Sequence, residues 1–327
     1  MLTRRALLGT AAGAASLATF ALHDRARAAS PPLQIVATTG MIADAAARVG
    51  GAAVAVQALM GAGVDPHAYR QTRSDIRALT QADLVLWHGL YLEAQMEAFL
   101  EDLARRVRTI AVTDRLLQEA LLAHEEYAGR FDPHVWMSPP LWSQIVIRIG
   151  DALSDARPEA AQAVSARTAA YLEEIAALET YSRDVLASVP EGSRVLLSAH
   201  DAFGYFGAAY GFEVIGIQGI STESEAGLAR IASLVELIVA RDIRAVFVET
   251  SVSDRNIRAL IEGADAKGHR VAIGGSLFSD AMGAPDSYEG TYLGMIDHNV
   301  TTIARALGGL APAKGRLGRL SLQEKQG

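Results

Sequence analysis

Residues 158–186 read PEAAQAVSARTAAYLEEIAALETYSRDVL, and this stretch decides how the rest of the chain is interpreted. After Pro158 it contains neither Gly nor a second Pro, Ala, Leu and Glu dominate it, and its apolar residues recur at helical spacing. At 1.5 Å per residue, a helix of this length spans about 40 Å. The sequence therefore predicts one long rigid helix, and not a flexible linker, between two halves of the chain.

On both sides of this helix, short β-rich runs alternate with longer helical runs. In the first half we expect strands at 34–39, 54–60, 83–87 and 109–112, with helices at 41–49 and 73–80. In the second half we expect strands at 194–198, 212–217, 245–249 and 271–273, with helices at 225–240, 254–267 and 290–307. Such alternation predicts an α/β fold. We expect two βα lobes, 29–157 and 189–327, each with a mostly parallel four-stranded sheet, joined by the connecting helix at 158–188.

The composition excludes several classes of function. The 327 residues carry 30 Lys and Arg against 37 Asp and Glu, a formal net charge of −7. This argues against nucleic acid or an anionic membrane as a partner, because both demand concentrated positive charge. The chain has no Cys, so disulfides, thiolate zinc sites, iron–sulfur clusters, cysteine nucleophiles and lipid attachment through an N-terminal Cys are excluded. Any soft-metal site must therefore use His, carboxylate or Met.

The first 28 residues are predicted to be a cleaved export signal. Arg4 and Arg5 precede an apolar run of small residues at 6–22, and Ala26-Arg27-Ala28 has the form of a cleavage site. The run is too short and too rich in Ala and Gly for a membrane span. Its removal takes away four Arg and one Asp, which changes the net charge from −7 to −10. We expect a soluble periplasmic protein without membrane insertion, exported by the Sec or the twin-arginine route.

Three of the eight histidines stand at expected strand-to-helix turns. His67 and His134 each end an Asp-Pro-His triplet, and His200 follows the strand expected at 194–198. Proline fixes its own φ and biases the preceding residue toward extended geometry, so a stiff loop presents each of the first two imidazoles. Asp280 follows the last expected strand. Because ligands bind beyond the carboxyl ends of strands in open α/β sheets, we expect these four residues in the cleft between the lobes.

Three imidazoles and one carboxylate form a donor set that suits zinc, which takes His nitrogen and Asp oxygen in a tetrahedron at about 2.0–2.2 Å. Each lobe would contribute two ligands, so the ion would hold the cleft closed. The residues alone leave an ordinary alternative open. A lone histidine in a loop is most often solvated or hydrogen-bonded, and separations of 66 to 80 residues are not a local metal motif.

Longer motifs surround these residues. They include Asp132-Pro133-His134-Val135-Trp136-Met137-Ser138-Pro139 and Ser198-Ala199-His200-Asp201-Ala202-Phe203-Gly204-Tyr205-Phe206. Further along the chain come Gly219-Ile220-Ser221-Thr222-Glu223, Phe247-Val248-Glu249-Thr250-Ser251-Val252-Ser253, Asp280-Ala281-Met282-Gly283 and Glu289-Gly290-Thr291-Tyr292. In this order the motifs resemble a known family, the periplasmic zinc- and manganese-binding proteins of ABC importers, or cluster A-I solute-binding proteins. The resemblance covers residues 33–308.

The resemblance implies a monomer that binds a divalent ion through His67, His134, His200 and Asp280 and delivers it to an ABC permease and its ATPase, without catalysis. Glu as the third ligand is typical of the manganese-selective members, whereas His is found in zinc binders and in some that take both ions. His200 favours zinc on chemical grounds too, because replacing oxygen by imidazole moves the preference away from hard manganese. We therefore expect Zn²⁺ as the substrate ion, with Mn²⁺ as the alternative.

Other residues near these motifs are expected to support the metal site and not to bind the ion, or to have no role in it. Many zinc-specific relatives carry a long His-rich loop between the first two ligands, whereas this chain offers only His124-Glu125-Glu126, which we interpret as a polar surface turn. His88 is expected to make a structural hydrogen bond. Candidates for orienting the ligand imidazoles are Asp65, Asp132, Asp201 and Glu249. Candidates for an apolar wall around the metal are Trp136, Phe203, Tyr205 and Phe206.

Two other functions stay open from the residues. In an exported zinc hydrolase, the three histidines would hold the metal and Asp280 would be a general base. No nucleophile elbow or His-Glu-x-x-His motif accompanies them, and four ligands saturate the ion. In a binding protein for an organic or chelated solute, the histidines would be incidental.

Overall fold

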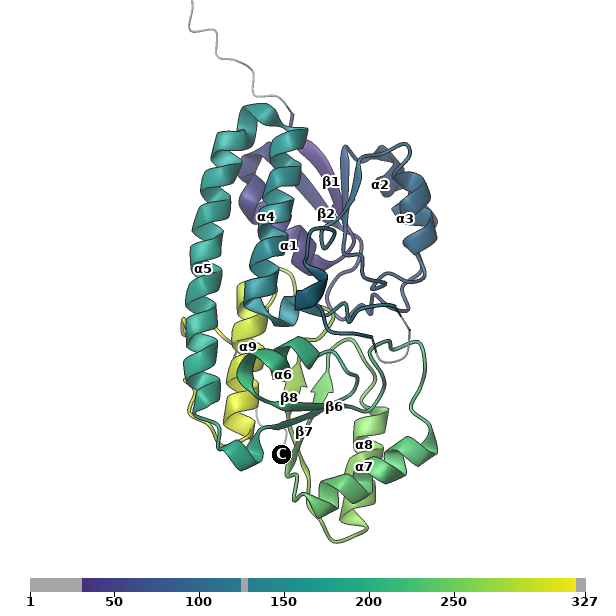
Figure 1. The fold of residues 1–327 in the computed structure, drawn as a ribbon, viewed down its shortest axis with the longest axis vertical. Coiled ribbons are helices and arrows are strands. Elements are labelled where there is room, and N and C mark those ends of the chain that lie inside the picture. Colours follow the sequence, from purple (N-terminus) through teal and green to yellow (C-terminus); the bar gives the residue numbers. More distant parts are fainter. Residues whose placement is uncertain (1–30, 125–128, 322–327) are drawn as a thin grey trace, which may run out of the picture. The chain divides into compact units, whose positions relative to one another are not determined.

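The first half of the chain folds around a four-stranded parallel sheet with the strand order β2-β1-β3-β4 (Figure 1). The computed structural model describes residues 31–124 and 129–321. Its first four strands are β1 (Leu33–Ala37), β2 (Val54–Ala58), β3 (Leu84–Trp87) and β4 (Thr109–Ala111). In the central pair, Ile35 of β1 lies opposite Leu84 of β3. β3 reads Leu-Val-Leu-Trp, and such a continuous apolar run is typical of a parallel strand that is covered on both faces.

Local capping signals explain where the first helices begin. These helices are α1 (Gly40–Gly50), α2 (Arg73–Gln81) and α3 (Glu97–Leu103). The hydroxyl of Thr39 accepts the N–H of Ile42 at the start of α1. Thr72 and Asp75 form a capping box at the start of α2. α1 and α2 therefore begin close to where the sequence pattern predicts them, whereas α3 has no side-chain cap and no counterpart among the expected helices.

The long helix expected at 158–186 is present as α5 (Ala161–Ala187), preceded by a short 3-10 turn at Pro158–Ala160. It packs against α4 (Pro139–Ala156) and α1, and also against α9 (Tyr292–Ala306) and α6 (Gly204–Tyr210) (Figure 1). Trp142 of α4 stacks on Tyr292 of α9, with 4.9 Å between ring centroids. The connecting helix is therefore held along its side by helices from both halves of the sequence.

The second half contains two parallel pairs of strands instead of the single four-stranded sheet that we expected. β5 (Val195–Ser198) pairs with β6 (Glu213–Gly216), and β7 (Ala245–Glu249) pairs with β8 (Ala272–Leu277). β5 packs beside β7, but the two share no hydrogen-bonded ladder within residues 129–321. The β7–β8 register shifts between Val246 and Phe247, and such a bulge bends a strand and increases its twist. The helices here are α7 (Leu228–Ala240) and α8 (Arg255–Asp265).

The α/β class and the parallel pairing expected from the sequence are confirmed. The described residues from Leu33 onward cluster as one compact unit, and the domain boundaries expected at 157/158 and 188/189 stay a prediction. The export signal expected at 1–28 lies outside the described residues, as do Glu125 and Glu126. Among the helices of the described segments, none combines the length and the apolar character that a bilayer span requires.

Candidate metal centre

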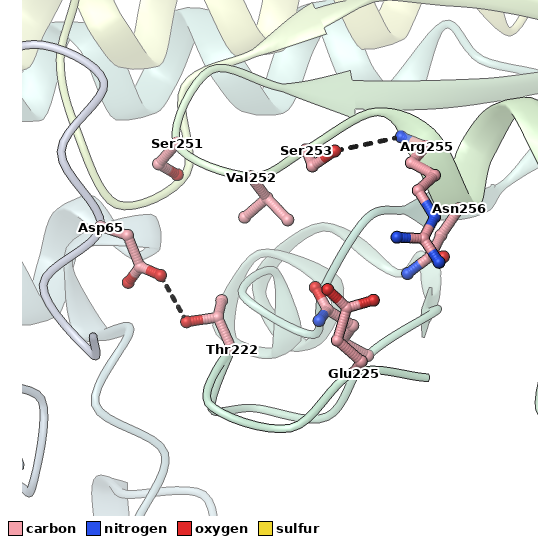
Figure 2. Close-up of a pocket in the computed structure, with 9 residues that line it drawn as sticks. Asp65, Thr222, Glu225, Ser251, Val252, Ser253, Arg255 and Asn256 are labelled. Atoms are coloured by element: carbon pink, nitrogen blue, oxygen red, sulfur yellow. Dashed lines mark hydrogen bonds between the residues drawn. The ribbon is translucent and has the colours of Figure 1, made fainter. Parts of the chain in front are cut away.

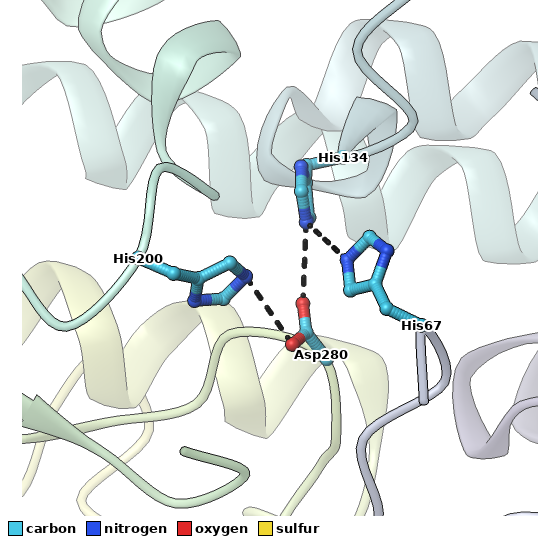
Figure 3. A group of neighbouring side chains, drawn as sticks. All are labelled: His67, His134, His200 and Asp280. Carbon is cyan, nitrogen blue, oxygen red and sulfur yellow. Dashed lines mark hydrogen bonds and ion pairs between the residues drawn. The ribbon is translucent and has the colours of Figure 1, made fainter. Parts of the chain in front are cut away.

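The structure brings the four residues singled out as ligands to one point (Figure 3). His67, His134, His200 and Asp280 each offer one ligand atom, and these atoms all lie within 4.8 Å of one another. None of the four side chains belongs to a residue that is more than 2% exposed. A buried cluster of this composition is unusual, because ionisable groups are seldom fully buried unless they are paired.

Each ligand candidate comes from a loop beside the end of a regular element. His67 lies in the connection between β2 and α2, and His134 directly precedes the 3-10 turn Val135–Met137, which leads into α4. His200 follows β5, and Asp280 follows β8. β2, β5 and β8 belong to three different sheets, so the loops meet through the tertiary packing of these sheets and not at the edge of one sheet. The fold therefore gathers side chains that are far apart in the sequence.

The distances within the cluster match the geometry of a tetrahedral ion. His134 Nε2 lies 3.3 Å from His67 Nε2 and 3.3 Å from Asp280 Oδ1. His200 Nε2 lies 3.3 Å from Asp280 Oδ2. Two donor atoms at about 2.0–2.1 Å from a tetrahedral zinc ion are about 3.3–3.4 Å apart. These three contacts thus have the spacing of neighbouring ligands in such a shell, two of them through different oxygens of Asp280, and one ligand atom from each of the four residues lies within 4.8 Å of the others.

Buried carboxylates hold two of the three imidazoles by their far nitrogen. Asp132 Oδ1 accepts the backbone N–H of His134 at 2.9 Å and its Nδ1–H at 2.7 Å. Glu249 accepts the backbone N–H of His200 through Oε1 at 2.9 Å and its Nδ1–H through Oε2 at 2.5 Å. A proton kept on Nδ1 leaves the lone pair of Nε2 for a metal. The structure thus gives Asp132 and Glu249 the orienting position that the sequence suggested for them.

His67 is held differently. Asp65 Oδ1 accepts its backbone N–H at 2.9 Å, while the imidazole ring has His134 as its one hydrogen-bond partner among the described residues. The second oxygen of Asp65 accepts the hydroxyl proton of Thr222 at 2.6 Å. For the last candidate, Asp201, the backbone N–H donates to the carbonyl of Gly219. His67 therefore has no carboxylate brace on its ring within residues 31–124 and 129–321.

Burial and the neighbouring charged groups shift the pKa values of the ligand residues in different directions. Burial and the nearby His134 and His200 rings lower the pKa of His67 to about 3. Burial also disfavours the charged form of His134, but Asp132 and Asp280 outweigh it and raise the pKa of that ring to about 9. Burial opposes ionisation of Asp280, yet His200 and His134 hold its pKa well below the usual range. The raised pKa of His134 means that metal binding has to compete with protonation of that ring, because a ligand imidazole must be neutral.

Aromatic and hydrogen-bonding groups fix the turn that carries His134. The Trp136 indole donates to the carbonyl of Ser279 at 2.8 Å, and its ring lies edge-on to those of His88 and His134. His88 Nε2 lies 2.7 Å from the carbonyl oxygen of Pro133, which is a structural hydrogen bond of the kind expected for this residue. Tyr205 donates to the carbonyl of Asp132 at 2.9 Å. The stiffness of the turn therefore comes from tertiary contacts as well as from proline.

Two residues near the cluster were not predicted. Ser251 Oγ lies 3.3 Å from Asp280 Oδ2, and Thr222 contacts Asp65 as described above. Both lie in motifs that carried the family resemblance, but a hydroxyl in a loop has no periodic or spacing signal of its own. Their positions become apparent only when the loops are packed together.

Comparison with known proteins gives consistent findings along most of the chain. Residues 35–306 match a family described as ZnuA, zinc-uptake complex component A periplasmic. The chain is 46% identical over 295 residues to the manganese-binding lipoprotein MntA of Bacillus subtilis (strain 168), with 89% of this chain and 96% of that protein covered. It is 42% identical over 289 residues to the zinc-binding protein TroA of Treponema pallidum (strain Nichols), with 88% and 93% covered.

Solved structures agree with these sequence matches. The periplasmic zinc-binding protein TroA from Treponema pallidum has a TM-score of 0.82 at 42% identity, with 84% of this chain and 99% of that chain covered. The Fe(III)-bound YtgA from Chlamydia trachomatis has a TM-score of 0.77 at 25% identity, with 85% and 99% covered. The likeness therefore extends over the whole length of both solved chains.

Proposed function

The chain belongs to the family of zinc-uptake complex component A periplasmic proteins, and from this premise we propose that it captures a divalent transition metal outside the cytoplasm and delivers it to an ABC-type importer. The family resemblance inferred from the sequence motifs is confirmed. The relatives MntA and TroA are named as metal-binding proteins and not as enzymes, and the chain is accordingly a binding protein. This excludes the hydrolase that the residues alone left open.

The observation that carries the proposal is the buried cluster of His67, His134, His200 and Asp280. Two of its atoms, His200 Nε2 and Asp280 Oδ1, are buried and make no hydrogen bond of acceptable geometry within the described segments. Buried polar atoms in native proteins nearly always have a partner, and a missing one costs free energy. A divalent ion at the centre would satisfy both atoms and neutralise the carboxylate. We assign the four residues as its ligands.

We propose zinc as the ion. Overall similarity does not choose between metals, because a manganese-binding relative and a zinc-binding relative are 46% and 42% identical to this chain. The donor set supports zinc, because three imidazoles and one carboxylate suit a tetrahedral zinc ion, whereas manganese prefers a shell rich in oxygen. Mn²⁺ remains the alternative substrate of the same site.

Capture of the ion requires no covalent bond to form or break. His67 and His134 come from the first half of the chain, and His200 and Asp280 come from the second half, so the ion completes its shell only when all four loops are in place. Because α5 packs against helices from both halves, we propose that loops rather than whole lobes move when the ion is released. The partners we propose are a permease and its ATPase. The protein is proposed to act as a periplasmic monomer after export by the Sec or twin-arginine route.

Competitive titration of the metal-free protein with Zn²⁺ and Mn²⁺ tests the function and the ion together. We expect one equivalent of zinc to bind, more tightly than manganese. Loss of a residue that only orients a ligand typically weakens metal binding by about 10–100-fold. His200→Ala removes a ligand itself and should weaken zinc binding by more than this. The matched control is His269→Ala, because His269 Nε2 lies 2.8 Å from the backbone carbonyl of Ile243 outside the cluster. Equal or tighter manganese binding would overturn the zinc assignment, and a protein indifferent to both ions would overturn the function.

A further inference from the structure

A polar pocket of about 180 Å³ lies beside the loops that carry His67 and Asp280. Figure 2 shows the side chains that line it. Its lining includes Asp65, Gln218, Thr222, Glu225, Ser251 and Arg255. Two of these residues also contact the ligand residues, because Asp65 accepts the backbone N–H of His67 and Ser251 lies 3.3 Å from Asp280 Oδ2. The pocket and the cluster therefore share a wall.

The cluster itself is shielded from water. The four ligand residues are at most 2% exposed, so an ion cannot reach or leave them unless some segment moves. A water molecule has a share of about 30 Å³ in the liquid, so the pocket has room for several. Its carboxylates and hydroxyls are the oxygen groups that a partly hydrated divalent cation contacts readily. Arg255 on the same lining limits how strongly the pocket could retain that cation.

One hydrogen bond crosses the wall between distant segments. Thr222 donates its hydroxyl proton to Asp65 Oδ2 at 2.6 Å, across 157 positions of sequence (Figure 2). The other oxygen of the same carboxylate holds the backbone of His67. Beside it, the Gln95 amide donates to Glu223. Two adjacent residues of the loop at 218–227, Thr222 and Glu223, thus form hydrogen bonds with the first half of the chain. The Thr222 bond is made to Asp65, which lies in the same loop as the ligand His67.

His67 is the ligand that this arrangement leaves easiest to move. Buried carboxylates fix the Nδ1 atoms of His134 and His200 at 2.7 and 2.5 Å. The His67 ring has no such brace among the residues described, and Asp65 restrains only its backbone. Segments that move in binding proteins are drawn from those with few restraining contacts.

We propose that the pocket is the mouth through which the ion reaches and leaves the cluster, and that the Thr222–Asp65 hydrogen bond is the latch that closes it. Opening the latch frees the His67 loop, removes one ligand from the shell and exposes the ion to the oxygen groups of the pocket. Thr222 and Asp65 are positioning residues, since neither touches the ion. This inference rests on the proposed function, because it requires a metal in the cluster.

The latch is tested by the rate at which the zinc-loaded full chain releases its ion to an excess of a chromogenic zinc chelator in a stopped-flow instrument. Thr222→Val keeps the shape of the side chain and removes the hydroxyl. We expect it to raise the dissociation rate about tenfold, as for a lost hydrogen bond to a charged group. Thr222→Ser restores the hydroxyl and should release zinc within about twofold of the wild-type rate. Thr180→Val is the matched control, because the Thr180 hydroxyl bonds within α5.

The mouth is tested by the association rate. Glu225→Gln removes an exposed charge from the lining without touching a ligand or the latch. We expect it to slow zinc association at low ionic strength about twofold and to leave dissociation unchanged. Glu173→Gln, on the exposed face of α5, is the control for charge alone. An equal slowing in both variants would contradict the assignment of the pocket as the mouth.

The outcomes separate this inference from the proposed function. A wild-type chain that binds no zinc would overturn the function itself. If the wild-type chain binds zinc and loses it on His200→Ala, but Thr222→Val releases zinc at the wild-type rate, then the latch alone is refuted. Equal acceleration in the Ser and Val variants would also refute it, because a general disturbance of the loop, and not the hydroxyl, would then be responsible.

Discussion

His200 and His67 present the same atom, Nε2, to the cluster, but the protein holds them in opposite ways. Glu249 grips His200 at both its backbone and its ring, whereas Asp65 holds only the backbone of His67 and shares its second oxygen with Thr222. The first arrangement fixes a ligand before the ion arrives. The second leaves a ligand whose position depends on a contact with another loop. A transport protein needs both, since it must bind its ion selectively and still release it.

The largest effect is expected from removing the firmly held ring. His200→Ala takes away a ligand and leaves the carboxylate of Glu249, a residue only 5% exposed, without its ring partner. Breaking a buried charge pair costs about 3–5 kcal/mol, so thermal denaturation of the metal-free variant should show a clear fall in Tm in addition to the lost zinc binding. His67→Ala should also weaken zinc binding but lower Tm less. Equal destabilisation of the two metal-free variants would remove the contrast between the ligands.

The next largest effect on zinc affinity is expected from changing Glu249, which orients the His200 ring. Glu249→Gln keeps the size of the side chain but replaces the carboxylate that orients His200. Loss of such an outer-shell partner typically weakens metal affinity by about 10–100-fold, and competitive titration with a zinc indicator should show this. Glu236→Gln is the control, because Glu236 lies on α7 and forms an exposed ion pair with Lys267. Wild-type zinc affinity in Glu249→Gln would mean that His200 needs no orienting group.

A smaller effect on zinc affinity is expected from changing Asp65, which holds the backbone of His67. Asp65→Asn retains one carbonyl oxygen for the His67 backbone but loses the charge that receives the Thr222 hydroxyl. We expect zinc affinity to fall by less than about tenfold, with most of the change in the dissociation rate, as is common for related complexes. Stopped-flow release and equilibrium titration together measure this division. A change confined to the association rate would contradict the role given to Asp65.

The smallest effect on zinc is expected at His88. Its ring supports the turn before His134 through a 2.7 Å hydrogen bond with the carbonyl oxygen of Pro133. His88→Leu leaves that carbonyl without its side-chain partner, which should lower the free energy of unfolding by about 1–3 kcal/mol in urea denaturation. Zinc affinity should stay within about threefold, because Asp132 still holds His134. A loss of affinity as large as that in Glu249→Gln would make His88 a part of the metal centre.

Parts of the fold could be predicted because their signals are local. The strand at Ala245–Glu249 and the helix at Ala161–Ala187 correspond closely to runs that are bounded by breakers in the sequence. α4 has no counterpart among the expected helices, and within it Ile145, Val146 and Ile147 form a β-branched run that also suits a strand. Packing against α5 and α1 makes this segment helical. The single four-stranded sheet expected in the second half was wrong, because strand periodicity does not report which neighbour a strand pairs with.

The candidate ligands could be singled out for a similar reason. Asp-Pro-His is a short, stiff pattern, and the Asp132 brace lies two residues from the ring that it holds. Glu249 is 49 residues from His200, and Thr222 is 157 residues from Asp65. From the sequence, Glu249 is one of four candidate carboxylates with no particular histidine as its partner, and no signal points to Thr222. Pairings of this kind require the loops to be placed side by side.

By itself, the amino-acid sequence determined the α/β class, the long connecting helix, the absence of thiol chemistry and the kinds of side chain from which a metal site could be built. These features follow from composition, periodicity and stiff local motifs, whose physics acts between near neighbours in the chain. Only the tertiary structure decided that four donor atoms meet within 4.8 Å, which carboxylate holds which ring, and which hydroxyl closes the wall beside them. The reason is that these contacts join segments whose separation in sequence says nothing about their distance in space.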